Sequence, residues 1–283
     1  MPNFVLHTDT TQRLAQFGQQ PGHALLIIGP SGIGKGTIAR TVAATITTTT
    51  PEAVDNHPYI RILKMDDKAR SISIETVREL EHFLTLKVPG DAPRVVIIED
   101  AHGLTTEAQN ALLKTLEEPV AHTTIILTAA GEQSLLPTIR SRAATITVKK
   151  PLATELETYF QGQGYDLKDV RQAHLMSGGL PGLMSALLNK DTTHPLVEAV
   201  TTARAIIQKS TFERLAMVDV LAKDREHCLN TLAILQQMAH VSMASGNNAK
   251  TWQRILQHCY QATDLLLASS QPKLTLTNLM LSL

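Results

Sequence analysis

Cysteine is scarce in this sequence, and its scarcity excludes two kinds of stabilising site. Only two of the 283 residues are cysteine, Cys228 and Cys259, and they lie far apart within helical patterns. Two cysteines are too few for a disulfide framework or for a four-cysteine zinc site. We therefore expect a protein without zinc.

Net charge and long apolar runs are missing as well. The 26 basic side chains balance 26 acidic ones, which disfavours a large, non-specific nucleic-acid surface. No apolar run approaches the roughly 18 residues that a membrane span needs, and residues 1–5 lack the pattern of a secretory signal. Because 43% of the residues are apolar, disorder is disfavoured. We expect a cytoplasmic globular protein with no membrane partner.

A glycine-rich segment follows the apolar run at 24–28, and this is the most informative pattern in the chain. In P-loop proteins such a strand is followed by a loop whose backbone N–H groups cradle nucleotide phosphates, while a lysine reaches the outer phosphates. The hydroxyl residue that usually follows the lysine binds Mg²⁺, but here that residue is glycine. The candidate nucleotide-binding residues are Gly29, Pro30, Ser31, Gly32, Ile33, Gly34, Lys35, Gly36 and Thr37.

The first 150 residues alternate strand-like and helix-like patterns. Apolar runs predict strands at 24–28, 59–63, 95–98, 124–128 and 145–148. Apolar residues at helical spacing predict helices around 38–46, 74–84 and 106–116, the last with Thr106 and Gln109 as a capping box. This alternation is typical of an α/β domain with a mainly parallel sheet.

Strand-like patterns stop after Pro151. Short helical patterns fill residues 151–194, residues 191–195 have the composition of a linker, and the remainder is helical with a capping box at Ser210 and Glu213. We predict three domains, at 1–150, 151–194 and 195–283. The apolar faces of the last domain form a self-contained bundle or pack in part against other subunits.

Two acids, Glu99 and Asp100, end the predicted strand at 95–98. Ligands bind where the strands of open α/β sheets end. There, one carboxylate normally holds Mg²⁺ and its neighbour polarises the attacking water. ATP-hydrolysing P-loop proteins usually have Asp before Glu, whereas here the order is reversed. Two acids at a strand end can also simply be solvated.

Several segments resemble the bacterial DNA polymerase III clamp-loader subunits, which are AAA+ proteins. They are residues 23–26, 99–102, 110–119 (Asn-Ala-Leu-Leu-Lys-Thr-Leu-Glu-Glu-Pro) and 136–142 (Leu-Pro-Thr-Ile-Arg-Ser-Arg). Residues 272–283 resemble the end of the delta-prime subunits in particular. The resemblance implies an AAA+ parallel-sheet P-loop domain, a small helical lid at 151–194 and an all-α collar at 195–283.

The same resemblance implies a role for Arg142. In this family a Ser-Arg-Cys motif supplies an arginine finger to the ATP of a neighbouring subunit, and here residues 141–143 are Ser-Arg-Ala. The cysteine is absent, but the arginine that carries the charge remains. An arginine's planar fork suits phosphate oxygens, although a surface arginine paired with an acid is the alternative.

Other positions depart from the pattern of ATP-hydrolysing clamp-loader subunits. Gly36 lacks the magnesium-binding hydroxyl, and residues 41–94 lack the cysteines of the zinc module. Counting back from Ser141, the polar sensor at the end of the fourth strand falls on Ala130, or on Thr128 after a shift of register. The second sensor arginine is replaced by Leu183.

Together these features predict a delta-prime-like subunit that helps the ATP-dependent loading of the sliding clamp onto primed DNA. It would donate Arg142 in trans and hydrolyse little or no ATP itself, so whether it is an enzyme stays open. ATP or ADP is the expected ligand, with Mg²⁺ accompanying the nucleotide at most. Expected partners are the motor subunits and delta, with the clamp and DNA reached through the complex.

Two alternatives remain at this point. One is an ATP-hydrolysing motor subunit of the same loader. The other is a small nucleotide kinase, because residues 32–37 match a pattern of adenylate-kinase-like enzymes, in which glycine follows the lysine.

Overall fold

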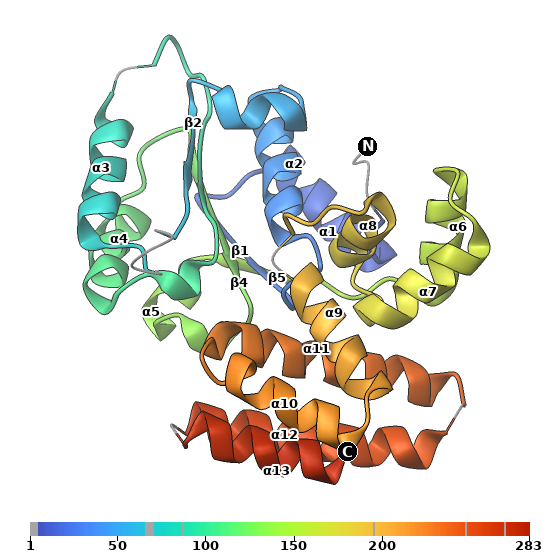
Figure 1. The fold of residues 1–283 in the computed structure, drawn as a ribbon. Helices are drawn as coiled ribbons and strands as arrows, with labels where there is room; N and C mark the ends of the chain where they lie inside the picture. Colours follow the sequence, from blue (N-terminus) through green and yellow to red (C-terminus); the bar gives the residue numbers. More distant parts are fainter. Residues whose placement is uncertain (1–4, 66–70, 87, 195, 247, 269) are drawn as a thin grey trace. The chain divides into compact units, whose positions relative to one another are not determined.

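The computed structural model describes residues 5–65, 71–86, 88–194, 196–246, 248–268 and 270–283 (Figure 1). The chain forms two compact units, residues 1–150 and 151–283. In the described part of the chain, none of the helices combines the length and the apolar character that a membrane crossing requires.

The first unit is built on a five-stranded parallel sheet with the order β2-β3-β4-β1-β5. Every residue of β1, β3 and β4 is buried, as expected for parallel strands that helices cover on both faces. All five predicted strands are confirmed to within one residue at each end. The strands are β1 Ala24–Ile28, β2 Ile60–Leu63, β3 Arg94–Ile98, β4 Thr123–Ala129 and β5 Ala144–Thr147.

Helices cover the two faces of this sheet (Figure 1). On one face lie α3 Ile74–Thr85, α4 Thr106–Glu117 and the short α5 Pro137–Arg140, and on the other lie α1 Thr8–Gln19 and α2 Lys35–Thr47. Three short 3-10 helices, η1 Pro51–Asn56, η2 Ala101–Gly103 and η3 Glu132–Ser134, join these elements. The sequence patterns did not reveal α1 or α5.

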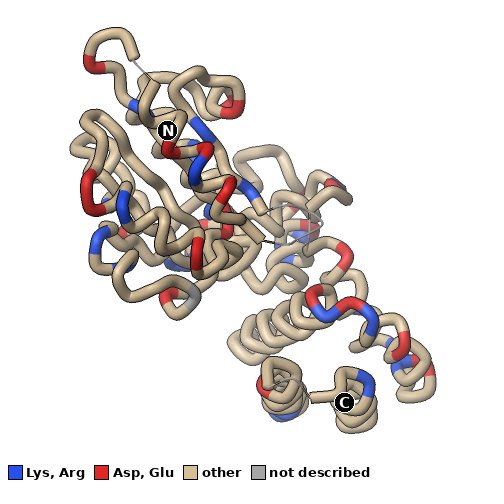
Figure 2. Tube along the Cα trace, turned by 90° about the vertical axis from the view of Figure 1, so that its left-hand side faces the viewer, with Lys and Arg blue, Asp and Glu red and all other residues tan. Residues whose placement is uncertain are grey.

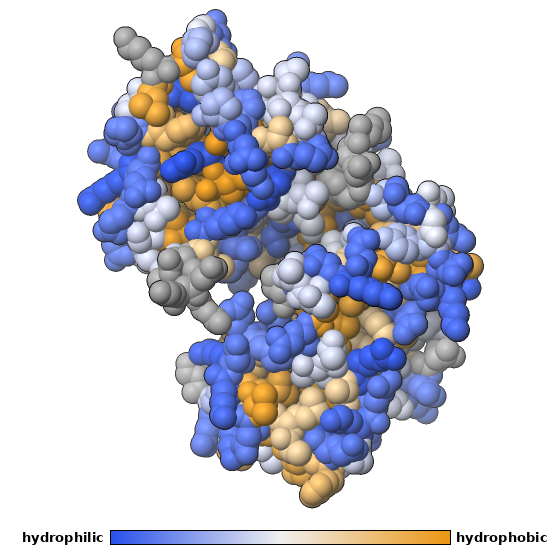
Figure 3. All heavy atoms as spheres, turned by 45° about the horizontal axis from the view of Figure 1, so that its top comes forward, coloured by the Kyte–Doolittle hydropathy of each residue, from blue (hydrophilic) through white to orange (hydrophobic). Residues whose placement is uncertain are grey.

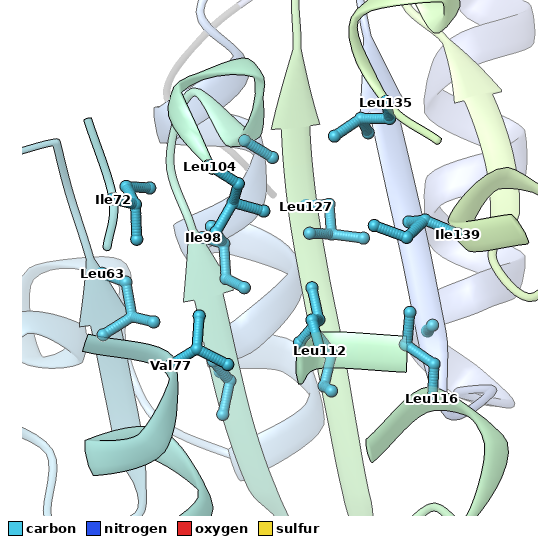
Figure 4. Close-up of a cluster of buried hydrophobic side chains, with 14 of the residues drawn as sticks. Leu63, Ile72, Val77, Ile98, Leu104, Leu112, Leu116, Leu127, Leu135 and Ile139 are labelled. Carbon is cyan, nitrogen blue, oxygen red and sulfur yellow. The ribbon is translucent and has the colours of Figure 1, made fainter. Parts of the chain in front are cut away.

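The core under α3 and α4 is entirely aliphatic at its centre. Figure 4 shows Val77 of α3 and Leu112 of α4 facing Ile98 and Leu127 of the sheet, and all four side chains are fully buried. Burying a Val, Leu or Ile side chain stabilises a fold by about 1.5–3 kcal/mol. This contact therefore fixes α4 firmly on the sheet.

The predicted capping box at α4 is wrong by one residue. Thr105, in an extended conformation, is the N-cap, and its side chain accepts a hydrogen bond from Ala108 N at 3.2 Å. Thr106 is already helical, so it cannot act as the cap. The second predicted box is confirmed, because Ser210 N donates to the Glu213 carboxylate at 2.9 Å.

The described residues of the second unit form helices and no strand. The helices are α6 Ala153–Gly162, α7 Leu167–Ser177, α8 Pro181–Asn189, α9 Val197–Gln208, α10 Thr211–Leu221, α11 Arg225–Ala244, α12 Ala249–Leu267 and α13 Pro272–Ser282. The predicted parallel-sheet domain with a helical C-terminal part is thus confirmed. A division of this unit at 194/195 stays a prediction, and Pro195, in the predicted linker, lies outside the described residues.

Helices from both sides of that predicted division pack together at Gly178. This residue follows α7 with a φ of +64°, and a Cβ atom added to it would lie 2.2 Å from the Cβ atom of Gln237 in α11. A side chain would therefore strain the backbone and also force α7 away from α11.

Gly178→Ala is expected to lower the free energy of unfolding by about 3 kcal/mol, from left-handed backbone strain and overpacking together. Gly164→Ala is the matched control, because Gly164 also has a positive φ of +92° but open space around it. Its loss is expected to be about 1 kcal/mol. Urea unfolding measures both variants, and equal losses would contradict the proposed close packing.

Candidate functional site

The glycine-rich loop joins β1 to α2 with the geometry of a phosphate-binding loop. Gly32 and Gly34 have φ values of +82° and +97°, which glycine adopts without strain. Gly29 N donates to Ala129 O at the end of β4 at 3.2 Å. Gly34 is the N-cap of α2, and a glycine has no side chain to satisfy the first-turn N–H groups. Phosphate oxygens are suited to that role.

Lys35 is the first residue of α2, and it lies within this loop. Its side chain is buried, and Nζ donates to Pro30 O at 3.3 Å. Burial lowers the pKa of Lys35, while the nearby Asp100 carboxylate opposes that shift. The ammonium group therefore sits in a poorly hydrated place where a phosphate would be a favourable partner.

The two acids lie where β3 ends. Asp100 has a left-handed backbone conformation, and its N–H donates to the Thr128 hydroxyl of the adjacent strand β4 at 3.0 Å. The parallel pairing of β3, β4 and β1 brings these residues and the glycine-rich loop to the same edge of the sheet. Residues 29–37, Glu99 and Asp100 are thus gathered as the sequence predicted them to be.

Thr128 and Ala130, the two positions predicted for the polar sensor, have different surroundings. Thr128 is buried in β4 next to Asp100, whereas Ala130 is exposed and lies beyond the strand. Leu183, at the predicted position of the second sensor, is completely buried in α8 of the second unit. It packs as an apolar residue and supplies no charge.

Glu99 is held by basic side chains. Arg40 of α2 forms an ion pair with its carboxylate through Nη1, and Lys64 Nζ lies 3.7 Å from Oε2. Sequence reasoning missed Arg40, although its spacing of one helical turn from Gly36 was a usable signal. Glu99 therefore belongs to a charge cluster rather than standing as a free metal ligand.

The residues around Glu99 do not fit the magnesium ion that P-loop ATPases bind. That ion is held by the hydroxyl after the P-loop lysine and by a carboxylate at the strand end. Here position 36 has no hydroxyl, and Glu99 is already paired with Arg40. Within the described ranges, no group of three His, Cys, Asp or Glu side chains could hold a metal ion.

Arg142 lies just after α5, with its side chain partly exposed. Nη2 is 2.7 Å from the Glu117 carboxylate of α4, and Nη1 donates to Thr138 O at 3.0 Å. The buried Gln109 of α4 holds the start of this segment, because its Oε1 accepts from Leu136 N at 2.9 Å. The arginine is therefore positioned by α4.

Arg142 and the glycine-rich loop lie at opposite edges of the sheet, that is, at the edges formed by the starts and by the ends of its parallel strands. The loop follows the end of β1, whereas Arg142 precedes β5, whose Ala144 pairs with Leu25 near the start of β1. Because a strand rises about 3.3 Å per residue, the five residues of β1 separate the two edges by about 17 Å. The structure does not bring Arg142 to this chain's own loop.

Comparisons with known proteins place this site in a family. The family described as DNA polymerase III, delta subunit, matches residues 8–151. DNA polymerase III subunit delta' of Pseudomonas aeruginosa is 34% identical over 137 residues, 44% of this chain and 42% of that protein. Subunit tau/gamma of Haemophilus influenzae is 31% identical over 149 residues, 48% of this chain and 22% of that protein.

A solved structure supports the fold over nearly the whole chain. The DNA polymerase III gamma subunit-related protein of Thermotoga maritima aligns with a TM-score of 0.50 and 18% identity, covering 96% of this chain and 97% of that one. In the two sequence matches, by contrast, the chain spans less than half the length of the relatives. The resemblance inferred from residues 23–26, 99–102, 110–119 and 136–142 is confirmed: the chain belongs to the DNA polymerase III delta-subunit family.

Proposed function

We propose that this chain is a delta-prime-like subunit of the polymerase III clamp loader. It would help ATP-dependent loading of the sliding clamp onto primed DNA and donate Arg142 to the ATP of a neighbouring subunit. The motor subunits and delta are its proposed partners, in the cytoplasm. The family match and the similarity to a delta' subunit support this role.

The observation that carries the proposal is the location of Arg142. It lies on the opposite edge of the sheet from the chain's own phosphate-binding loop, so it is available only to a nucleotide held by another chain. The pair with Glu117 is half exposed, and exposed ion pairs contribute at most about 1 kcal/mol. Glu117 therefore orients the guanidinium without preventing it from moving to a phosphate.

The chain's own pocket is proposed to bind ATP or ADP and to hydrolyse it slowly or not at all. The loop glycines and the buried Lys35 support binding. Gly36 and the paired Glu99 argue against hydrolysis, because two of the usual ligands of the metal that neutralises charge in phosphoryl transfer are missing or occupied.

Assembly with other subunits is proposed to use the helices of residues 195–283, with 151–194 as a lid. Large apolar side chains are exposed on α10, α12 and α13, with Phe212 82% and Val220 72% exposed. Figure 3 shows apolar residues at the surface of this unit, and Figure 2 shows basic and acidic residues interspersed in both units. Apolar exposure of this kind fits protein partners, and the mixed charge fits contact with DNA through the complex.

A motor subunit is the second candidate, because the tau/gamma subunit of Haemophilus influenzae is also similar. Two features argue against the motor-subunit role. Glu99 and Asp100 stand in the reverse of the usual Asp-Glu order, and Gly36 lacks the hydroxyl that binds Mg²⁺. A nucleotide kinase is disfavoured by the family to which residues 8–151 belong.

ADP is expected to bind the wild-type protein, and Lys35→Ala is expected to weaken binding by about tenfold or more, because the buried cation is lost. Isothermal titration measures both affinities. Lys273→Ala is the matched control, since this exposed lysine pairs with Asp219 in the second unit and is outside the loop. Absence of heat for the wild type would end the nucleotide-binding proposal.

Steady-state phosphate release from the isolated subunit separates the two candidate roles. We expect a rate below about 10⁻² s⁻¹, far under the 1–10³ s⁻¹ of typical enzymes, and no change in Lys35→Ala. A brisk rate that disappears in Lys35→Ala would favour the motor-subunit role.

Arg142→Ala is expected to lower the ATPase rate of the reconstituted clamp loader by about tenfold or more, because a phosphate-contacting charge is removed. Subunit assembly, measured by analytical ultracentrifugation, should be unchanged. Arg140→Ala is the matched control, a neighbouring arginine paired with Glu132. Equal ATPase rates for wild type and Arg142→Ala would refute the arginine-finger role.

A further inference from the structure

Arg40 links the phosphate-binding helix to the end of β3 through three acceptors. Its Nη1 donates to Gly36 O, one turn earlier in α2, at 3.3 Å and also pairs with Glu99. Its Nε donates to the Asp55 carboxylate of η1 at 3.0 Å. The side chains of Arg40 and Glu99 are both mostly buried, so water screens this pair only in part.

Gly36 lies against the ends of the Arg40 and Glu99 side chains. A Cβ atom at position 36 would lie 2.9 Å from Glu99 Oε1 and 3.3 Å from Arg40 Nη1. The serine or threonine that P-loop ATPases have at this place would therefore press on the ends of both side chains, and the pair would have to shift to make room. The absence of a hydroxyl at position 36 and the presence of the Arg40 guanidinium therefore belong together: the guanidinium lies where a side chain at position 36 would need space.

The charges around Glu99 leave it little tendency to bind a cation from solution. Burial acts to lower the pKa of Arg40, but its bonds with Glu99 and Asp55 outweigh burial and raise that pKa. Arg40 is thus permanently charged, and Lys64 adds a second positive charge 3.7 Å from Glu99. A divalent cation would have to displace one of these groups from the carboxylate.

We propose that the Arg40 guanidinium fills the position in which P-loop ATPases hold Mg²⁺, and that the pocket takes a nucleoside di- or triphosphate without metal. The second claim, that the pocket takes a nucleotide, rests on the proposed function. The first claim, that Arg40 replaces the metal ion, does not. The ion would be excluded because its carboxylate is paired and its hydroxyl ligand is absent.

This replacement changes what the pocket can do chemically. A guanidinium carries one positive charge, and it cannot act as a Lewis acid or bind a water molecule as a nucleophile. Arg40 is also held by Asp55 and by Gly36 O, in addition to its pair with Glu99. The pocket can therefore hold an anion but lacks the means to activate it.

A double-mutant cycle without any ligand tests the steric coupling. Gly36→Thr is expected to lower the melting temperature in the wild-type background and to lower it by less than half as much in Arg40→Ala, because Glu99 is then free to move aside. Gly131→Thr is the matched control, since Gly131 has extended backbone and open space around it. Additive losses for Gly36→Thr and Arg40→Ala would overturn the proposal.

The metal alone gives a second test that needs no nucleotide. Electron paramagnetic resonance of Mn²⁺ should detect no binding to the wild type or to Arg171→Ala, whose exposed arginine pairs with Glu157. Binding should appear in the Gly36→Thr/Arg40→Ala variant and disappear when Glu99→Gln is added. Wild-type Mn²⁺ binding that Glu99→Gln removes, or no gain in the double variant, would overturn the proposal.

Nucleotide binding provides the third test. The ADP affinity of the wild type with Mg²⁺ and with EDTA should agree within about twofold, whereas the Gly36→Thr/Arg40→Ala variant should bind more tightly with Mg²⁺. A wild-type affinity that requires Mg²⁺ would overturn the metal replacement. Failure of the wild type to bind ADP in either buffer would instead refute the proposed ligand, and the first two tests would still decide the role of Arg40.

Discussion

Parallel pairing of β1 with β4 and β5 is the constraint on which the site depends. Because all five strands run in one direction, their ends divide the charged residues between two edges. One edge collects the glycine-rich loop, Glu99, Asp100 and Thr128, and the other carries Arg142. The strands β1, β3 and β4 are fully buried, so the charged groups of the site lie where these strands begin and end.

The two edges carry complementary halves of phosphoryl-transfer chemistry. The edge with Lys35 has the geometry to hold phosphates, but its Glu99 is paired with Arg40 and position 36 has no hydroxyl, while the edge with Arg142 has a cation in place of a phosphate-binding loop. Neither edge is complete by itself. This separation agrees with the proposed role, in which Arg142 acts on a nucleotide held by a neighbouring subunit. The common direction of the strands is what separates Arg142 from the chain's own phosphate-binding loop.

The sequence was sufficient for features that depend on neighbouring residues. Fully buried parallel strands are continuous apolar runs, so residues 24–28 and 95–98 were recognisable. The ion pair of Arg40 with Glu99 joins residues 59 positions apart, and only the strand order brings them together. The place of Thr128 could not be fixed either, because a count from Ser141 depends on how residues 130–140 fold between β4 and β5.

The attachment of Arg142 to α4 has a mechanical consequence. Two side chains of the same helix hold its segment: Gln109 binds Leu136 N near one end, and Glu117 binds the guanidinium near the other. The segment that carries the arginine is therefore tied to α4 at two points. A displacement of that helix would carry the segment with it, so the place from which the guanidinium reaches out is set by α4.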